Sequence, residues 1–264
     1  MKNLPGLTTI LFLLFSFKSC ATFSSVGLDN HYIMDGNSDL TSTDNSTIKI
    51  NHNTWNALLK KHVQNNGLVD YKGFIKDEAK LNDYLKMLSL NQPNSTWSKP
   101  KILAYYINLY NAATVKLIIE NYPVKSIKDI SRPWSKNRVL IGNEMISLNN
   151  IEHGILRKMN EPRIHFALNC ASISCPKLLN EAFTADKIEQ QLERVTNEFI
   201  NSKENNISIS EAKISSIFKW YKKDFLVNEK KDLIGFINQY SKVKINSNTT
   251  ISYLDYNWNL NETI

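Results

Sequence analysis

The chain has 264 residues, enough for one large domain or two small ones with a sizeable hydrophobic core. Hydrophobic residues make up 42% and charged residues 22% of the sequence, which excludes a fibrous or largely disordered protein. The formal net charge is +7, but the lysines are scattered and no nucleic-acid recognition motif accompanies them. We therefore expect no nucleic-acid partner.

Residues 1–20 predict a signal peptide. Lys2 supplies a positive charge, and an apolar segment from Leu7 to Phe17 follows, too short to span a bilayer comfortably. Ser19 and Cys20 come directly after it and resemble the cleavage site of bacterial lipoproteins, in which the cysteine carries the lipid. We expect export to the periplasm or cell envelope, either with a lipid anchor at Cys20 as the sole membrane contact or with simple cleavage of the signal.

The rest of the chain divides into a short polar segment and a long globular one. Residues 21–50 are rich in Ser, Asn, Asp and Thr and show little periodicity, which predicts a flexible tether because such a composition buries too little apolar surface. Residues 51–264 contain no internal repeat and no linker rich in proline or glycine. They predict one globular domain.

Hydrophobic periodicity in this domain predicts a helix-rich α+β fold with a small antiparallel sheet. The predicted helices are Trp55 to Val63, Leu81 to Leu88, a long apolar helix from a Ser98 cap to about Glu120, Ser147 to about Met159, Ile188 to Phe199, a short piece through Trp220, and Leu233 to Tyr240. The predicted strands are a hairpin of Arg138 to Ile141 and Glu144 to Ile146, a strand from Ile164 to Leu168, and a strand at Ile207 to Ile209.

The chemistry-bearing residues are concentrated between Glu152 and Pro176. A cysteine nucleophile reacts as the thiolate, which a nearby imidazole can stabilise. Cys175 is the predicted nucleophile, His165 on the predicted strand is its base, and Glu152 is the carboxylate that orients the imidazole. These residue types together indicate a cysteine hydrolase.

Polar side chains near these three residues are candidates for substrate binding. Asn108 and Asn111 lie on one stripe of the long apolar helix and offer amide donors to a substrate carbonyl or an oxyanion. The remaining candidates are His153, Arg163 and Asn169.

Three other interpretations stay open. In an oxidising compartment, Cys170 and Cys175 would form a structural disulfide that closes a small loop. His165 and the helix asparagines would then be buried structural groups. A zinc site of His153, His165, Cys170 and Cys175 is the third interpretation, although the paired Cys-x-x-Cys spacing is absent. We expect no metal and no cofactor.

Two other enzyme classes lack their motifs. Ser172 and Ser174 are not part of a Gly-x-Ser-x-Gly elbow, which argues against a serine hydrolase. No Walker or dinucleotide-binding fingerprint is present, and the chain has only 8 glycines, which argues against a phosphate-binding loop.

Several phrases resemble the domain-of-unknown-function family numbered 547, over roughly residues 51–261. The phrases are AYYINLYNA at 104–112, IEHGILR at 151–157, PRIHFALNCASISCP at 162–176, IFKWYKKDF at 217–225 and YNWNLN at 256–261, where Asn257 replaces the usual Asp.

This family is distantly similar to transglutaminase and papain-type cysteine hydrolases, which pack a central helix against a small sheet that carries the histidine. In those enzymes the nucleophile opens the central helix, whereas the helix around Ala104 contains no cysteine. From the clustering of histidine, cysteine and carboxylate residues, we expect an exported thiol-dependent hydrolase of an amide or peptide-like bond in a small molecule or peptide, with its thiol on the Cys175 loop. The alternative is a non-catalytic envelope binding module with a structural Cys170–Cys175 bridge.

Overall fold

The structure of the protein is a computed structural model that describes residue 47 and residues 49–263. The predicted signal peptide, Cys20 and nearly all of the predicted tether lie outside the described residues. The described part of the chain is helix-rich with small sheets, which confirms the predicted α+β class.

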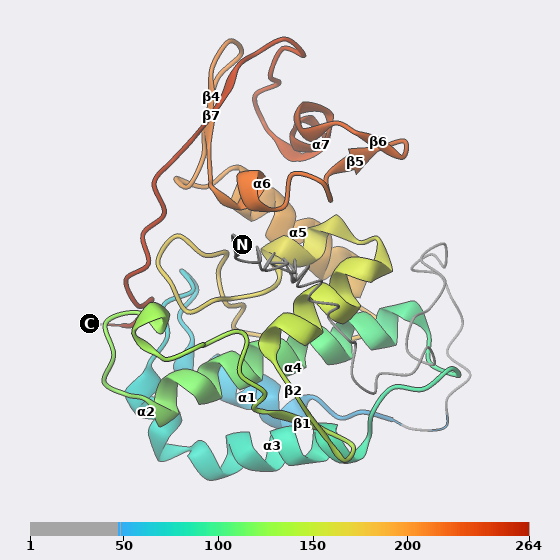
Figure 1. Cartoon of the computed structure of the whole chain (residues 1–264), viewed down its shortest axis with the longest axis vertical. Helices are drawn as coiled ribbons and strands as arrows, with labels where there is room; N and C mark the ends of the chain where they lie inside the picture. Colours follow the sequence, from blue (N-terminus) through green and yellow to red (C-terminus); the bar gives the residue numbers. More distant parts are fainter. Residues whose placement is uncertain (1–46, 48, 264) are drawn as a thin grey trace, which may run out of the picture.

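The first half of the domain begins with four helices, the last of which is the central helix of the core (Figure 1). They are α1 (Asn53–His62), α2 (Tyr71–Lys76), α3 (Glu78–Leu90) and α4 (Lys99–Glu120). Ser98 caps α4 by accepting a hydrogen bond from Lys101 N–H, and Pro100 occupies the first turn. Nearly every side chain of α4 is buried, so this helix forms the centre of the core.

Helix α4 is long and apolar enough to cross a membrane by length and composition. However, 94% of its most apolar window is buried inside the protein, as expected for the core helix of a globular domain. Among the described residues it is the one helix that passes this test.

A hairpin and a series of short helices follow. The helix η2 (Ile127–Asp129) leads into the predicted hairpin, in which β1 (Val139–Ile141) pairs antiparallel with β2 (Glu144–Ile146). The helix predicted from Ser147 to about Met159 is present, but most of it is not α-helical. It consists mainly of the π-helix η3 (Asn150–Ile155) and the 3-10 helix η4 (Leu156–Met159).

The predicted strand from Ile164 to Leu168 is wrong, because this segment is the 3-10 helix η5 (Pro162–Phe166). Pro162 has no backbone N–H for a sheet ladder and sits at the first turn of the helix. The Glu161 side chain caps the turn by accepting the Arg163 N–H. His165 and Phe166 are therefore both buried, instead of pointing to opposite faces of a strand.

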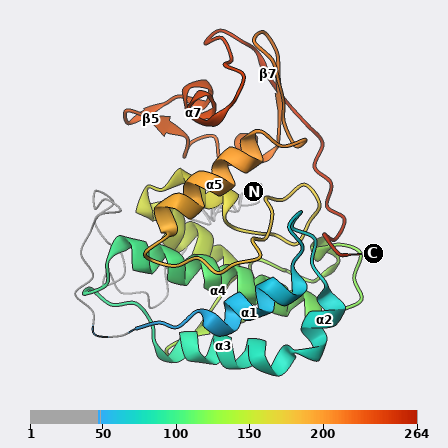
Figure 2. The ribbon, with the colours of Figure 1, turned by 180° about the vertical axis from the view of Figure 1, so that it is seen from behind.

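The C-terminal half places a long helix and small sheets on one side of α4 (Figure 2). Helix α5 (Ile188–Ile200) leads to a three-stranded sheet in which β4 (Ala212–Ile214) lies between β3 (Asn206–Ile207) and β7 (Ile251–Tyr253). The β4–β7 pair is parallel and the β3–β4 pair antiparallel. The remaining elements are α6 (Ile217–Trp220), the β5 (Leu226–Val227) and β6 (Lys230–Lys231) hairpin, and α7 (Leu233–Tyr240).

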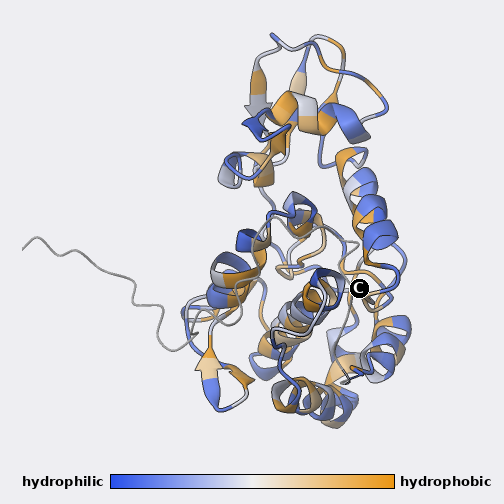
Figure 3. Cartoon of the chain, turned by 90° about the vertical axis from the view of Figure 1, so that its right-hand side faces the viewer, coloured by the Kyte–Doolittle hydropathy of each residue, from blue (hydrophilic) through white to orange (hydrophobic). Residues whose placement is uncertain are grey.

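One continuous core joins the two halves, with buried side chains from Trp55 to Leu260. Phe166 of η5 packs among the rings of Phe199, Phe218, Phe225 and Phe236 from the C-terminal half. Figure 3 shows apolar and polar residues on different sides of the helices, as this burial requires. The short helix η5 is thus fixed between the central helix and the C-terminal elements.

The chain after β7 returns to the helical half and ends beside α2 (Figure 1). This C-terminal segment, residues 254–263, runs along the loop of residues 169–176, which we call the thiol loop. Ile173 N–H donates to Asn259 O at 2.9 Å, and Asn261 N–H donates to Ala171 O at 3.3 Å. The C-terminal segment therefore holds the thiol loop in place from one side.

Candidate functional site

The thiol loop has a constrained backbone. Ala171 has φ +57°, a left-handed conformation that is rare for alanine. Asn169 stabilises it by accepting the Ala171 N–H at 2.9 Å and donating to Pro176 O at 2.8 Å. The resulting tight loop lets Cys170 N–H donate to Cys175 Sγ at 2.8 Å. The two cysteines are therefore neighbours in space.

Cys170 and Cys175 are free thiols, both partly exposed, and they lie side by side. The neighbouring Cys175 side chain lowers the pKa of Cys170 against the opposing effect of burial, and contacts with Ser172 Oγ at 3.1 Å and Tyr256 OH at 3.2 Å lower it further. Burial and the adjacent Cys170 raise the pKa of Cys175 well above its usual range. Cys170 is therefore the more acidic thiol of the pair.

Both thiols line a cavity of about 250 Å³ that we call the aromatic cavity. Three of the sequence-predicted site residues, Glu152, His153 and His165, line the same cavity. Its walls are completed mainly by aromatic side chains, namely Tyr110, Trp134, Trp220, Tyr221, Tyr256 and Trp258. The structure thus gathers the predicted thiol, imidazole and carboxylate around one space.

The imidazole of His165 is held by Asp224, not by Glu152 as predicted. His165 Nε2 lies 2.8 Å from Asp224 Oδ2, and Arg157 donates to both oxygens of the same carboxylate, at 2.6 and 2.8 Å. The ring also stacks on Tyr221, with the centroids 3.9 Å apart. Asp224 follows α6, so the carboxylate comes from a segment 59 residues away from His165.

Charge and burial set the protonation states of His165 and Asp224. Burial lowers the pKa of His165, although the hydrogen bond to Asp224 acts in the opposite direction. Burial acts to raise the pKa of Asp224, but hydrogen bonds from His165 and Arg157 outweigh it and hold that pKa well below its usual range. A neutral imidazole beside a fixed carboxylate is suited to accept a proton.

Glu152 is buried in the wall of the aromatic cavity and is hydrogen-bonded by tyrosine hydroxyls. Tyr221 OH donates to Glu152 Oε1 at 2.5 Å, and Tyr110 OH donates to Oε2 at 3.3 Å. Burial and the charge on Glu152 raise the pKa of both tyrosines, so both stay protonated donors. His153 Nδ1 is 4.0 Å from Glu152 and 3.2 Å from Arg157 Nη1.

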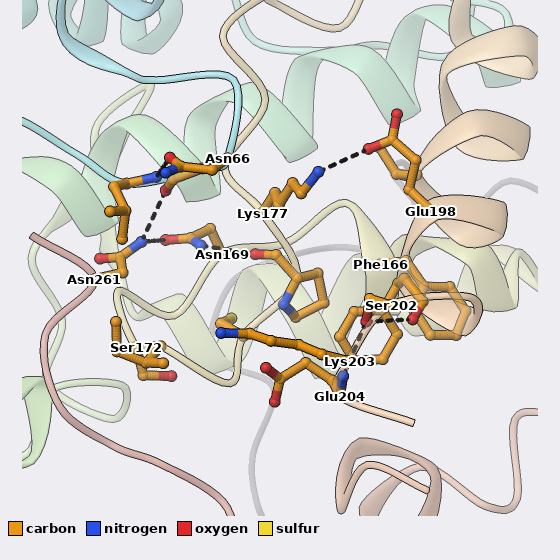
Figure 4. A pocket seen from close by; sticks show the side chains of 17 residues that line it. Asn66, Phe166, Asn169, Ser172, Lys177, Glu198, Ser202, Lys203, Glu204 and Asn261 are labelled. Atoms are coloured by element: carbon orange, nitrogen blue, oxygen red, sulfur yellow. Dashed lines mark hydrogen bonds and ion pairs between the residues drawn. The ribbon is translucent and has the colours of Figure 1, made fainter. Parts of the chain in front are cut away.

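A second cavity of about 360 Å³ lies on the other side of Cys175 and Pro176, which line both cavities. We call it the apolar cavity, because Leu68, Phe166, Val195 and Phe199 are among its walls. Figure 4 shows its polar margins, with Asn169 and Asn261 on one side and the Lys177–Glu198 pair on another. The thiol loop therefore separates two hollows.

Asn108 and Asn111 line neither cavity, and their amides serve the fold. Asn108 bonds both the N–H and the carbonyl of Phe183, at 3.0 and 2.7 Å. Asn111 accepts the Asn169 N–H at 2.9 Å and donates to Ala167 O at 2.9 Å. With both ends occupied by backbone groups, these amides are not free for substrate, which corrects the prediction that they bind it.

Arg163 also has a structural position outside both cavities. Its guanidinium forms ion pairs with Glu161 at 2.7 Å and with Glu189 of α5 at 2.7 Å. It therefore joins η5 to α5 instead of reaching a ligand, which corrects its prediction as a substrate-binding residue. Asn169 lines the apolar cavity, but its amide is occupied within the thiol loop.

The zinc interpretation gains no support from this geometry. Within the described part of the chain, no three His, Cys, Asp or Glu side chains are placed to hold a metal ion together.

Sequence reasoning missed Asp224 and the aromatic walls. The signal lay in two phrases quoted above for the family resemblance, residues 217–225 and 256–261, which contain Trp220, Tyr221, Asp224, Tyr256 and Trp258. The hydrophobic pattern offers no way to bring these phrases beside the thiol loop, because residues 217–225 are placed by long-range packing of the core and residues 256–261 by the path of the chain after β7.

Comparison with known proteins supports the resemblance over part of the chain. Residues 94–200 match the family model described as "Protein of unknown function, DUF547". This segment extends from before α4 to the end of α5 and includes both cysteines, Glu152 and His165. No curated protein and no solved structure gives a significant match.

Proposed function

We propose that this protein is an exported thiol-dependent hydrolase that acts on an amide or peptide-like bond. The observation that carries the proposal is the Cys170–Cys175 pair, which shares a cavity with the Asp224-held imidazole of His165. A polarised thiol, a positioned base and a concave site are the parts that thiol hydrolysis requires.

Within this proposal, Cys170 replaces Cys175 as the nucleophile. Its sulfur lies beside Cys175 and within 3.1 Å of Ser172 Oγ and 3.2 Å of Tyr256 OH, and these neighbours lower the pKa of Cys170 and so favour a thiolate. Cys175 stays protonated and stabilises that charge.

The proposed reaction has two stages. The Cys170 thiolate attacks the substrate carbonyl carbon, a C–S bond forms and the C–N bond breaks, while His165 passes a proton from solvent water to the leaving amine. Water then attacks the thioester and gives a proton to His165, the C–S bond breaks, the sulfur leaves as the thiolate and the acid departs, and the proton on His165 returns to the solvent. Asp224 stabilises the imidazolium in each stage.

The test is alkylation of the native, reduced protein with iodoacetamide at pH 6 and pH 8, with the modified residue located by peptide mass. An ordinary thiol with a pKa of about 8.5 reacts roughly 75-fold more slowly at pH 6 than at pH 8. We expect Cys170 to react nearly as fast at pH 6 as at pH 8. The C175A variant tests whether the reactivity of Cys170 at pH 6 depends on the neighbouring thiol. The C170A variant should abolish the fast alkylation at pH 6.

Ordinary pH dependence at both cysteines would overturn the proposal of an activated thiol. Fast labelling at pH 6 that survives C170A and disappears in C175A would return the role of nucleophile to Cys175. A positive result would then direct a screen of amide and peptide substrates against wild type and C170A.

The second candidate is a non-catalytic binding module of the cell envelope. The contact between the two thiols favours it, because oxidation to a structural disulfide needs the same proximity. The hydrolase candidate includes a distant likeness to transglutaminase and papain-type hydrolases. In this protein the proposed nucleophile lies on the thiol loop and not on the central helix, since α4 carries no cysteine.

Export is part of the proposal and rests on the N-terminal sequence. The mass of the mature N-terminus tests it: a chain that begins at a lipid-modified Cys20 indicates an anchored protein, and one that begins at an unmodified residue beyond the apolar segment indicates a freely exported one. An intact Met1 in the cytoplasm would contradict export.

A further inference from the structure

Glu152 is a buried carboxylate with no cationic side chain dedicated to it. Its oxygens are bonded by two neutral tyrosine hydroxyls, and among the described residues its one ion-pair partner is His153, at 4.0 Å. The guanidinium of Arg157 is committed to Asp224 through two hydrogen bonds. A buried negative charge is costly unless a positive charge compensates it.

The walls beside Glu152 suit a positive charge. Aromatic rings attract a cation placed over their faces, and Trp134, Trp220, Tyr256 and Trp258 line this cavity. Two rings of the same cavity already carry cations of the protein: Lys128 Nζ lies 5.2 Å from the Trp258 ring, and the Arg157 guanidinium lies 5.3 Å from the Tyr221 ring. Aromatic rings around an anionic group form a site complementary to an organic cation.

The size of the cavity limits the ligand to a small group. Its volume of about 250 Å³ is below the range of roughly 300–1,000 Å³ that is typical of sites for drug-sized ligands. It therefore accepts a side chain or a terminal group. Because Cys170 and Cys175 form part of the same wall, a group bound there lies beside the thiols.

We infer that the aromatic cavity binds a positively charged group of the substrate, a protonated amine or a quaternary ammonium, with Glu152 as its counter-ion. This inference rests on the proposed function in calling the ligand a substrate, but binding of the cationic group does not itself require a reactive thiol. The substrate class is an amide or peptide with a cationic group close to the bond that is cleaved.

Binding of benzylammonium, measured by calorimetry and by tryptophan fluorescence on the C170S protein, tests the inference. Benzyl alcohol is the neutral probe of similar shape. We expect benzylammonium to bind at least tenfold more tightly than benzyl alcohol, and this preference to disappear in C170S combined with E152Q. Glu211→Gln provides the matched control, because Glu211 is an exposed carboxylate that does not line the cavity.

A second variant keeps the test decisive if E152Q fails to fold. Trp220 is 47% exposed and lines the cavity, so W220A should leave the fold intact and weaken benzylammonium binding several-fold. Equal binding of the charged and neutral probes, or unchanged binding in both variants, would overturn the inference. If the protein binds the cation but has no thiol that reacts at pH 6, the hydrolase proposal is overturned and the cation site stands. If a thiol reacts at pH 6 but the cation does not bind, the cation site is overturned and the hydrolase proposal stands.

Discussion

Asp224 accepts a hydrogen bond from His165 across 59 residues of sequence, at 2.8 Å. The contact joins η5, which lies between α4 and α5 along the chain, to the segment after α6. Arg157 of η4 binds the same carboxylate, so three separate segments meet at one side chain. Loss of Asp224 should therefore change both the stability of the domain and the state of the imidazole.

Asp224→Asn should lower the free energy of unfolding at pH 7 by about 1–3 kcal/mol, because an ion pair and a charge-assisted hydrogen bond are lost. The pKa of the Asp224 carboxyl is lowered in the folded state, so its contribution is present above the unfolded pKa of about 4 and is lost as the pH falls. The variant should thus show a flatter loss of stability below pH 5 than wild type. Urea unfolding at several pH values measures this, with the exposed Asp83→Asn as control; an unchanged profile contradicts the assigned role.

Asn111→Ala should destabilise the domain by about 1–3 kcal/mol, because the buried Asn169 N–H loses its acceptor. It should also change the alkylation rate of the thiol loop, since Asn169 shapes that loop. Asn108→Ala is the matched control: it removes a similar pair of bonds, but to Phe183. Denaturant titration and labelling of both variants separate the two effects. Equal labelling in the two variants would show that Asn111 does not position the loop.

Gly73→Ala should destabilise the domain by about 1–3 kcal/mol through overpacking. A Cβ atom at this position would lie 2.3 Å from both Asp70 Oδ2 and His62 Nδ1. Gly154→Ala meets nothing within 4 Å and lies in η3, so it should be neutral or stabilising by up to about 1 kcal/mol. Thermal unfolding of the two variants compares them directly, and a Gly73→Ala protein as stable as wild type would contradict the close approach of Asp70 and His62 to Gly73.

The intact mass of the purified mature protein, with and without reductant, tests the binding-module alternative. A free thiol pair predicts the same mass in both conditions, whereas a Cys170–Cys175 bridge predicts a mass lower by two hydrogens before reduction. A bridge that forms in the mature protein and resists mild reduction would favour the structural role. A mass that does not change favours the thiol chemistry.

Capping residues and hydrophobic spacing along the chain correctly predicted helices such as α4 and α5. The Ser98 cap with Pro100 fixed the start of α4, and the spacing of Ile188, Leu192, Val195 and Phe199 fixed α5. The strand predicted from Ile164 to Leu168 is wrong, because Pro162 favours the start of a helix and the segment 162–166 is η5. Both His165 and Phe166 are buried, which the sequence pattern around them does not predict.

The candidate site was predictable in its residue types and not in its contacts. Cysteine, histidine and glutamate between residues 152 and 175 indicated the chemistry, and Glu152, His165 and Cys175 do line one cavity. The partner of His165 was assigned to Glu152, since that carboxylate is near in sequence. Asp224 takes this position because the core of phenylalanine rings brings the segment after α6 against η5, and such long-range packing leaves no periodic trace.

The C-terminal segment has a consequence for the order in which the site is built. Cys170 and Cys175 are followed by some 80 residues before Tyr256 and Trp258, which complete the cavity wall, and Tyr256 also contacts the thiol loop. During synthesis on the ribosome, the thiols thus emerge long before this part of their surroundings does. The contacts of Cys170 with Cys175 and Ser172 are local, whereas its contact with Tyr256 forms only when the last part of the domain has been made, so a nascent or prematurely terminated chain lacks it.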